Sequence, residues 1–293
     1  MILVNGQETS SIHVTDRGFQ YGDGCFSTLE VRSGAPLFWS RHRSRLERDC
    51  SRLHIPFECA DALDAEVIAV AASGGDGVLK VILTRGVGGR GYRWPDVLQP
   101  SRVISFHLRP DYPASWASSG VVLRLCQTRL GINPSLAGIK HMNRLEQVLA
   151  RNEWPDAEVQ EGLLLDTLGW VVEGTMSNLF LVRSGRLETP RLDRCGVAGV
   201  MRELIMELAT SLGMAVREVR CRLPHVSQSD EIFLTNSLIG VWPVRRLENQ
   251  QWQPGPITLG LANAVEQAKN QESLQSSLSR GTLGSNEGNP CIA

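Results

Sequence analysis

The stretch GINPSLAGIKHMNRLEQVLA, residues 131–150, leads from a predicted strand through an irregular loop into a predicted helix. Lys140 stands at the junction of loop and helix, after the turn-forming pair Asn133-Pro134 and the small Gly138. Binding residues concentrate in loops of this kind. A lysine near a helix start also meets the positive end of the helix dipole, which lowers the pKa of its amine toward the reactive neutral form. The alternative is an ordinary surface lysine.

Lysine is scarce in this chain, which narrows the candidates for chemistry that needs an amine. Only three of the 30 Lys and Arg residues are lysines, namely Lys80, Lys140 and Lys269. Lys80 falls within an apolar predicted strand, and Lys269 ends a polar predicted helix near the C-terminus. Lys140 alone occupies an irregular segment, so it is the preferred candidate.

The first part of the chain, residues 1–110, predicts a small α+β domain. Runs of β-branched and apolar residues predict strands at residues 2–4, 25–31, 78–84 and 103–108. Between these runs, helices are predicted at residues 39–54 and 61–72, the first because Leu46, Cys50 and Leu53 fall on one helical face. Pro110 and Pro113 interrupt both helix and strand, so residues 111–120 are predicted to be an interdomain linker.

The second and larger predicted domain covers residues 121–272. Strands are predicted at residues 121–126, 162–165, 178–182, 215–219 and 231–235, and helices at 143–153, 199–212 and 257–271. Because helices and strands alternate without a strict βαβ period, we expect an α/β protein with mixed α+β sheets, in which the larger domain is a barrel-like mixed sheet. Residues 273–293 are rich in Ser, Gly, Asn and Gln and predict a disordered tail.

A glycine-rich loop, RGVGGRGY at residues 85–92, follows a predicted strand. Trp94 and Pro95 come next instead of a helix, so the loop does not match the dinucleotide-binding pattern. Two interpretations stay open: a flexible surface loop, or a lid that brings Arg90 and Tyr92 to an anionic substrate. Arginine suits the second role because its guanidinium binds carboxylates with two parallel hydrogen bonds.

Two further glycine-marked stretches contain candidate groups. In WVVEGTMSNLF, residues 170–180, Glu173 is a single acid between apolar residues and a turn of small residues. A strand-end carboxylate exposed to solvent is the alternative there. In GVAGVMR, residues 196–202, small residues precede a predicted helix, whose free backbone N–H groups make an anion site. The alternative for this segment is simply the start of a helix.

Composition excludes several classes of function. The net charge of −1 produces no field over the whole molecule that would favour nucleic acid or an anionic membrane. No apolar run approaches the roughly 20 residues that span a bilayer, and the N-terminus lacks the features of a signal peptide. The seven cysteines are an odd number without a CxxC pair, so we expect reduced thiols, no zinc site and a cytoplasmic location.

Taken together, these stretches resemble the fold-type IV pyridoxal-phosphate enzymes. That family includes branched-chain and D-amino-acid aminotransferases and aminodeoxychorismate lyases. The resemblance runs from about residue 1 to 267, with the motifs in the same order. Three segments are similar to the lyase branch in particular: QYGDGCF at residues 20–26, residues 84–92, and LAGIKHMNRLEQVL at residues 136–149. Where the aminotransferases commonly carry a tyrosine shortly after the lysine, this chain has Arg144 at roughly that place.

The resemblance implies a pyridoxal 5'-phosphate cofactor and a role for each matched position. Lys140 would bind the cofactor covalently and then act as acid and base, and Glu173 would face the pyridine nitrogen. The cofactor phosphate would be held by the groups that match the family's phosphate ligands: Arg45, the backbone N–H groups of Val200 and Met201, and the Ser237 hydroxyl. Asn236, next to Ser237, is a further candidate for substrate binding, together with Arg90 and Tyr92.

The resemblance also implies a reaction. As a member of the lyase branch, the protein would convert 4-amino-4-deoxychorismate to 4-aminobenzoate and pyruvate in folate biosynthesis, as a homodimer in which the partner chain helps to form the active site. The near alternative is a branched-chain or D-amino-acid aminotransferase, which would share Lys140, Glu173 and the phosphate ligands. A protein on this scaffold that binds a ligand without catalysis is a more distant alternative.

Overall fold

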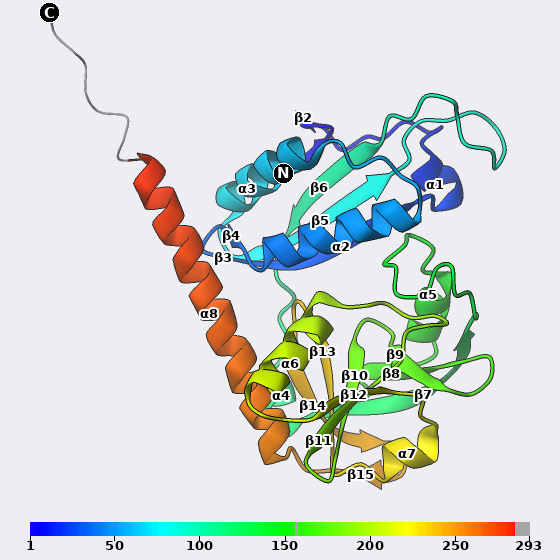
Figure 1. Cartoon of the computed structure of the whole chain (residues 1–293), viewed down its shortest axis with the longest axis vertical. Helices are drawn as coiled ribbons and strands as arrows, with labels where there is room; N and C mark the ends of the chain where they lie inside the picture. The colour runs from blue at the N-terminus through cyan, green and yellow to red at the C-terminus, as the bar shows by residue number, and fades with distance from the viewer. Residues whose placement is uncertain (156–157, 285–293) are drawn as a thin grey trace, which may run out of the picture.

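The computed structural model describes residues 1–155 and 158–284, which form two curled sheets with helices packed against them (Figure 1). The first sheet has six strands in the order β2-β1-β6-β5-β3-β4, and all neighbouring pairs are antiparallel. Its strands are β1 (Ile2–Val4), β2 (Gln7–Glu8), β3 (Gly24–Arg32), β4 (Ala35–Pro36), β5 (Gly77–Thr84) and β6 (Ser101–His107).

The second sheet has nine strands and mixes parallel with antiparallel pairs. The order is β12-β11-β10-β13-β14-β7-β8-β9, with β15 paired to β14, and the parallel pairs are β11 with β12, β14 with β7, and β7 with β8. Its strands are β7 (Val121–Leu130), β8 (Glu161–Asp166), β9 (Val171–Gly174), β10 (Asn178–Arg183), β11 (Arg186–Pro190), β12 (Val216–Val219), β13 (Glu231–Asn236), β14 (Gly240–Leu247) and β15 (Gln250–Gln251).

The large sheet curls, because β9 at one end of the strand order also lies against β10 and β11 from the other half. This confirms the expected barrel-like mixed sheet. Both faces are buried, and alternate residues of one strand serve different cores. In β10, Leu179 and Leu181 face one core, while Phe180 and Val182 face a second core together with α6 and α8.

Eight helices are present among the described residues. They are α1 (Arg17–Tyr21), α2 (Trp39–Arg52), α3 (Ala60–Gly74), α4 (Ala114–Ser119), α5 (Leu145–Arg151), α6 (Val200–Ser211), α7 (Leu223–Ser227) and α8 (Pro256–Gly284). Helices α2 and α3 share one core with the six-stranded sheet, to which α2 contributes Leu46 and Cys50, and α3 contributes Leu63 and Val67. The apolar face predicted for the helix at residues 39–54 therefore packs into the core, as its apolar periodicity predicted.

The sequence analysis did not predict four strands of the large sheet: β9, β11, β14 and β15. Strand β14 contains Pro243, which lies opposite Phe233 of β13. Proline has no N–H to donate and argues against a strand that lies inside a sheet. The structure accommodates it beside an irregular register between β14 and β7.

The residues predicted to be a linker also hold structure. Helix α4 forms within them, and its Trp116 packs edge-on against Trp242 of β14, with ring centroids 5.1 Å apart. Tyr112 packs against the same Trp242 ring at 4.9 Å. The prolines end the preceding strand, but the aromatic side chains hold this segment on the large sheet.

Helix α8 runs along both sheets, shown in orange to red in Figure 1. Its Lys269 amine lies 2.7 Å from Glu30 of β3, and both side chains are buried. The prediction that Lys269 ends a polar helix is therefore wrong, because the helix continues for several turns and this lysine faces the six-stranded sheet.

The prediction of a disordered tail from Ser273 is also wrong as far as Gly284, because α8 extends to that residue. Residues 273–280 contain no proline or glycine, and adding a residue to an existing helix costs much less than starting one. Residues 285–293 of the predicted tail lie outside the described residues.

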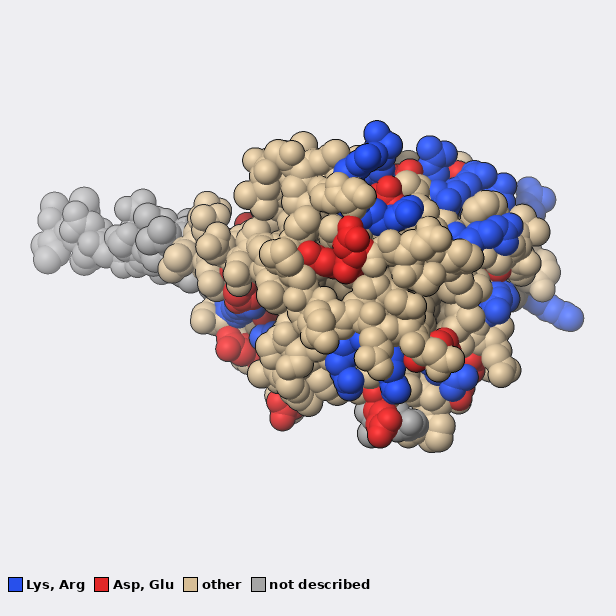
Figure 2. All heavy atoms as spheres, turned by 90° about the horizontal axis from the view of Figure 1, so that it is seen from below, with Lys and Arg blue, Asp and Glu red and all other residues tan. Residues whose placement is uncertain are grey.

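Charge is spread unevenly over one face of the molecule. On the face seen in Figure 2, Lys and Arg side chains gather toward one edge, with acidic side chains among them and elsewhere. Within residues 1–155 and 158–284, no helix is long and apolar enough to cross a membrane.

Candidate active site

A pocket of about 330 Å³ brings together most of the predicted site residues. Its volume falls in the range of small-molecule sites. The side chains or backbone of seven predicted residues line it: Arg45, Lys140, Glu173, Val200, Met201, Asn236 and Ser237. They come from α2, the loop before α5, β9, the start of α6 and the end of β13. The pocket therefore draws on elements of both sheets.

The backbone of Lys140 is fixed from two sides. Its carbonyl oxygen accepts a hydrogen bond from the Phe26 N–H of β3 at 3.0 Å, and its own N–H donates to the Asp49 carboxylate of α2 at 3.1 Å. Two residues earlier, Gly138 adopts a φ of +81°, a conformation that favours glycine. Gly138 also exchanges backbone hydrogen bonds with the segment at Gly196 and Ala198. The loop that carries the lysine is thus rigidly placed.

The amine of Lys140 lies in the pocket, 4.6 Å from the centre of the Phe26 ring. The pKa of this amine is lowered to about 7, mainly by burial and also by the cationic Arg45 and Arg144. The sequence argument predicted the direction of the shift but assigned the wrong cause. Helix α5 begins only at Leu145, so desolvation rather than the helix dipole weakens the charged form.

Glu173 is a buried carboxylate at the end of β9. Its Oε2 accepts a hydrogen bond from the Val197 N–H at 2.9 Å and one from the Asn178 side chain at 3.4 Å. Burial raises the pKa of Glu173 to about 7, while the Val197 hydrogen bond and the nearby cations Arg144 and Lys140 act in the opposite direction. A cationic group next to this carboxylate would favour its ionised form. The exposed strand-end alternative is excluded.

Arg45 has the properties of an anion ligand. It is buried, and one of its nitrogens, Nη2, donates to the Ser27 hydroxyl at 2.6 Å. Its Nε is buried without a hydrogen-bond partner among the described residues. Burial lowers the pKa of Arg45 to about 10. A buried guanidinium with an unmet donor is costly unless an anion completes it.

The other proposed phosphate ligands converge on the same pocket. Helix α6 begins at Val200, and its N-cap residue is Gly199, which has no side chain that could cap the first N–H groups. The first N–H groups of a helix bind anions well when no side chain caps them. Val200, Met201 and Ser237 line the pocket with Arg45. A guanidinium, a helix start and a hydroxyl fit the phosphate of pyridoxal phosphate, and Lys140 and Glu173 fit its aldehyde and its ring nitrogen.

Asn236 lines the pocket, but its side chain already has three structural hydrogen bonds. Its Oδ1 accepts from the N–H groups of Leu238 and Ile239 at 2.9 and 3.0 Å, and its Nδ2 donates to the Met176 carbonyl at 3.1 Å. These bonds shape the turn that presents Ser237. Its contribution as a side-chain substrate ligand is therefore restricted.

Arg90 and Tyr92 do not line this pocket. Both are exposed, and 85% of the surface of Tyr92 is accessible. Arg17 donates hydrogen bonds to the carbonyls of Gly91, Tyr92 and Arg93, at 2.9, 3.2 and 3.4 Å. The glycine-rich segment is therefore tied to α1, and the pocket of the same chain does not include the two predicted residues.

Several pocket residues were missed by the sequence analysis. Asp49, which holds the Lys140 backbone N–H beside the pocket without lining it, was missed as well. It lies four residues after Arg45 on α2, so helical spacing places both on one face and could have identified it. Tyr112 reaches the pocket from the segment predicted to be a linker. Arg144 and Gln147 also line it, and each has a buried polar atom without a partner among the described residues. Tertiary folding brings these three residues into the pocket, and of them the sequence analysis had singled out only Arg144.

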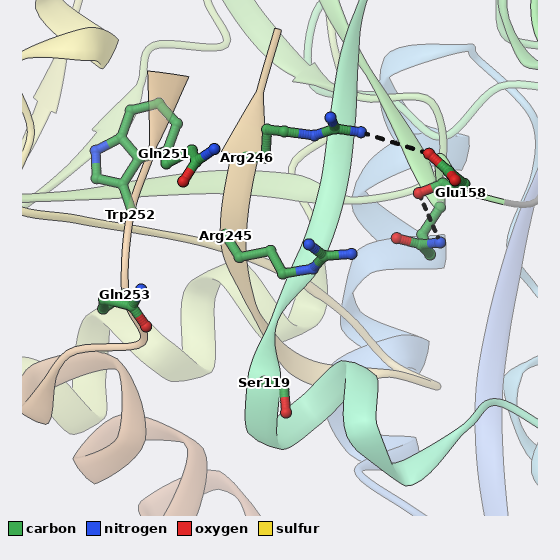
Figure 3. Close-up of a pocket in the computed structure, with 8 residues that line it drawn as sticks. Ser119, Glu158, Arg245, Arg246, Gln251, Trp252 and Gln253 are labelled. Atoms are coloured by element: carbon green, nitrogen blue, oxygen red, sulfur yellow. Dashed lines mark hydrogen bonds and ion pairs between the residues drawn. The ribbon is translucent and has the colours of Figure 1, made fainter. Parts of the chain in front are cut away.

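A larger hollow of about 460 Å³ lies elsewhere, on the side of β14 and β15 (Figure 3). Its lining includes Arg245, Arg246, Glu158 and Trp252, and none of the predicted site residues. Arg246 lies 3.9 Å from Glu158. Because this hollow contains neither the amine nor the unpaired Arg45 donor, we assign the site to the smaller pocket.

Comparisons with known proteins show what this chain is similar to. The family model Amino-transferase class IV matches residues 24–247. Aminodeoxychorismate lyase of Vibrio harveyi is 41% identical over 245 residues, which cover 83% of this chain and 90% of the relative. A probable branched-chain-amino-acid aminotransferase of Thermotoga maritima is 32% identical over 248 residues, 82% of this chain and 84% of that protein. The crystal structure of 4-amino-4-deoxychorismate lyase from Pseudomonas aeruginosa is similar with a TM-score of 0.88 and 46% identity, and the match covers 91% of this chain and 98% of that one.

Proposed function

Because the chain belongs to the class IV aminotransferase family, we propose that it is a pyridoxal-phosphate-dependent lyase that converts 4-amino-4-deoxychorismate to 4-aminobenzoate and pyruvate. The observation that carries the proposal is the buried Lys140 amine, whose pKa is lowered to about 7, in one pocket with Glu173 and Arg45. The identity of 41% and 46% to two lyases favours this reaction over amino-group transfer.

Each ligand of the cofactor has a proposed place in the pocket. Lys140 would hold the cofactor covalently through its aldehyde, and Glu173 would keep a proton on the ring nitrogen. Arg45, the N–H groups at the start of α6 and the Ser237 hydroxyl, which line the pocket together, would bind the phosphate. When bound, pyridoxal phosphate holds the substrate nitrogen and withdraws the electrons released at the neighbouring carbon.

The chemistry of the chain's own residues follows from these places. With the substrate amine held by the cofactor, the Lys140 amine would be free to remove the proton from C4 of the substrate. The electrons left at C4 expel the enolpyruvyl oxygen from C3, and the ring becomes aromatic. Protonation of the departing enolpyruvate by Lys140 gives pyruvate. The atoms balance without water, because 4-aminobenzoate and pyruvate together contain every atom of the substrate.

The reaction is tested by product analysis. Purified protein loaded with pyridoxal phosphate and given 4-amino-4-deoxychorismate should release 4-aminobenzoate and pyruvate in equal amounts, measured by fluorescence and by coupled lactate dehydrogenase. A parallel assay offers an amino acid and a 2-oxo acid. Amino-group transfer in the second assay with no 4-aminobenzoate in the first would overturn the proposal in favour of an aminotransferase.

We also propose that the protein is a homodimer. Helix α5 presents Leu145, Val148 and Leu149 to solvent, with 75%, 53% and 63% of their surfaces accessible. Exposed apolar clusters of this kind mark interaction sites. This helix directly follows the lysine loop, so a second copy bound there would lie close to the active site. Arg90 and Tyr92, which lie outside the pocket of their own chain, would then act in the pocket of the partner.

Mixing two inactive variants tests this shared site. Lys140→Ala and Arg90→Ala chains, each homogeneous, should have little activity, whereas dimers with one chain of each kind contain one site with both residues intact. Unfolding and refolding the two variants together should therefore restore up to about a quarter of wild-type activity, from half of the chains pairing as mixed dimers with one of two sites intact. A monomeric mass by light scattering, or no recovery from the mixture, would contradict the shared site.

We further propose two domains, residues 1–110 and 121–272, in a cytoplasmic protein. The two sheets occupy separate parts of the chain, joined through α4. The six cysteines within the described residues are free thiols, which is typical of proteins in a reducing compartment. Cell fractionation would test the location, and limited proteolysis near residues 111–120 would test the domain boundary.

A further inference from the structure

Four side chains form a hydrogen-bonded series beside the phosphate ligands. Arg45 donates from Nη2 to the Ser27 hydroxyl at 2.6 Å. The same hydroxyl lies 2.7 Å from His42 Nδ1, and His42 Nε2 lies 3.5 Å from the Ser237 hydroxyl. The series joins α2, β3 and the end of β13, and His42 and Ser237 are 195 residues apart in the chain.

The direction of each hydrogen bond follows from the donors available. Arginine has no acceptor, so Ser27 must accept from Arg45. Ser27 and His42 are buried, and within the described parts of the chain the Ser27 hydroxyl has hydrogen bonds only to these two side chains. The hydroxyl hydrogen of Ser27 therefore needs His42 Nδ1 as its acceptor, because a buried donor without a partner is costly.

This arrangement selects one form of the His42 ring. With Nδ1 accepting, a neutral ring carries its hydrogen on Nε2, which faces Ser237. Burial, followed by the nearby Arg45 and Lys140 cations, lowers the pKa of His42 well below its ordinary value, so the ring stays neutral. Nε2 then donates to the Ser237 oxygen, and the hydrogen of Ser237 is free to point elsewhere. The opposite ring form would attract the Ser237 hydrogen and turn its lone pairs toward the pocket.

We propose that His42 is a positioning residue that orients the Ser237 hydroxyl as a hydrogen-bond donor to the cofactor phosphate. It acts without touching the phosphate, through a relay that begins at Arg45 and passes through Ser27. Arg45 thus serves the anion twice, once by its unpaired donor and once by setting the direction of this series. The inference rests on the proposed cofactor site but not on which reaction the enzyme catalyses.

Two amide substitutions separate the two ends of the ring. In His42→Asn the side-chain oxygen can replace Nδ1 as the acceptor for Ser27, but nothing replaces Nε2. In His42→Gln the terminal amide nitrogen reaches the position of Nε2 and can still donate to Ser237. The affinity of the apo protein is measured for pyridoxal phosphate and for pyridoxal, which lacks the phosphate, by titration of the absorbance of the bound cofactor.

We expect His42→Asn to weaken pyridoxal phosphate binding by about 5- to 10-fold, as for the loss of one typical hydrogen bond, and to change pyridoxal binding by less than about twofold. The affinity of His42→Gln for pyridoxal phosphate should be closer to that of the wild-type protein than the affinity of His42→Asn is. Ser237→Ala should weaken pyridoxal phosphate binding similarly, and adding His42→Asn to Ser237→Ala should cost little more, because both remove the same interaction.

Two results would overturn the inference: equal losses for both cofactor forms, which indicate a general structural role, and fully additive losses in the double variant. If His42→Asn fails to fold, as judged by its circular dichroism spectrum, the Ser27→Ala variant replaces it. That variant also breaks the relay, so unchanged affinity for pyridoxal phosphate would equally overturn the proposal. Failure of the wild-type protein to bind either form would instead refute the cofactor assignment, and failure of the product assay alone would refute only the lyase reaction.

Discussion

Lys140→Ala should abolish covalent attachment of the cofactor and lower kcat by about 10²–10⁴-fold or more, the typical contribution of a positioned proton-transfer group. Lys140 is the amine in the pocket, and burial keeps a large fraction of it neutral near pH 7 because its pKa is lowered to about 7. Alanine supplies neither the covalent bond nor the base. Borohydride reduction followed by mass spectrometry measures the attachment, and 4-aminobenzoate release measures turnover.

Lys80→Ala is the matched control for this variant. Lys80 of β5 lies against the same Phe26 ring, with its amine 5.3 Å from the ring centre compared with 4.6 Å for Lys140. It does not line the pocket. The Lys80 variant should therefore still attach the cofactor. Reduced cofactor found on Lys80 of the wild-type protein, or normal turnover by Lys140→Ala, would show that the lysine has been assigned wrongly.

Glu173→Gln should retain the covalently bound cofactor but lower kcat by about 10²–10³-fold, comparable to the loss of one preorganised electrostatic contact at a reacting centre. The glutamine oxygen can still accept the hydrogen bonds from the Val197 N–H and from Asn178, so the local structure should survive. What the substitution removes is the negative charge that, in the proposed site, would hold a proton on the ring nitrogen. Absorbance of the bound cofactor and steady-state kinetics separate the two effects.

Glu231→Gln provides a control for the loss of a buried carboxylate. Glu231 is also buried, and it accepts hydrogen bonds from the N–H groups of Ile257 and Thr258 at the start of α8, at 3.2 and 2.7 Å. It does not line the pocket. Both variants should lose some thermal stability, but only Glu173→Gln should lose turnover to this degree. A kcat of Glu173→Gln within about twofold of wild type would remove Glu173 from the mechanism.

Local patterns in the sequence were enough to predict much of the secondary structure. Strand β3, predicted at residues 25–31, spans Gly24–Arg32, and α2, predicted at residues 39–54, spans Trp39–Arg52. Apolar residues recur in these segments with the regular spacing of a strand or a helix, and that spacing can be read from neighbouring residues alone. Strand β14 was missed because Pro243 masks its pattern, and only its paired neighbours on both sides make it a strand.

The sequence by itself determined which residues could perform the chemistry: one lysine in a loop, one acid between apolar residues, and a helix start preceded by small residues. Only the tertiary structure decided the pKa values of these groups and the residues that they contact. It lowers the pKa of Lys140 by burial rather than by a helix dipole, and it leaves Arg90 outside the pocket of its own chain. It also brings His42 to Ser237. The physical reason is that desolvation and hydrogen bonds between distant residues arise only when the chain packs. Residue type and apolar periodicity, in contrast, can be read from a short stretch of sequence.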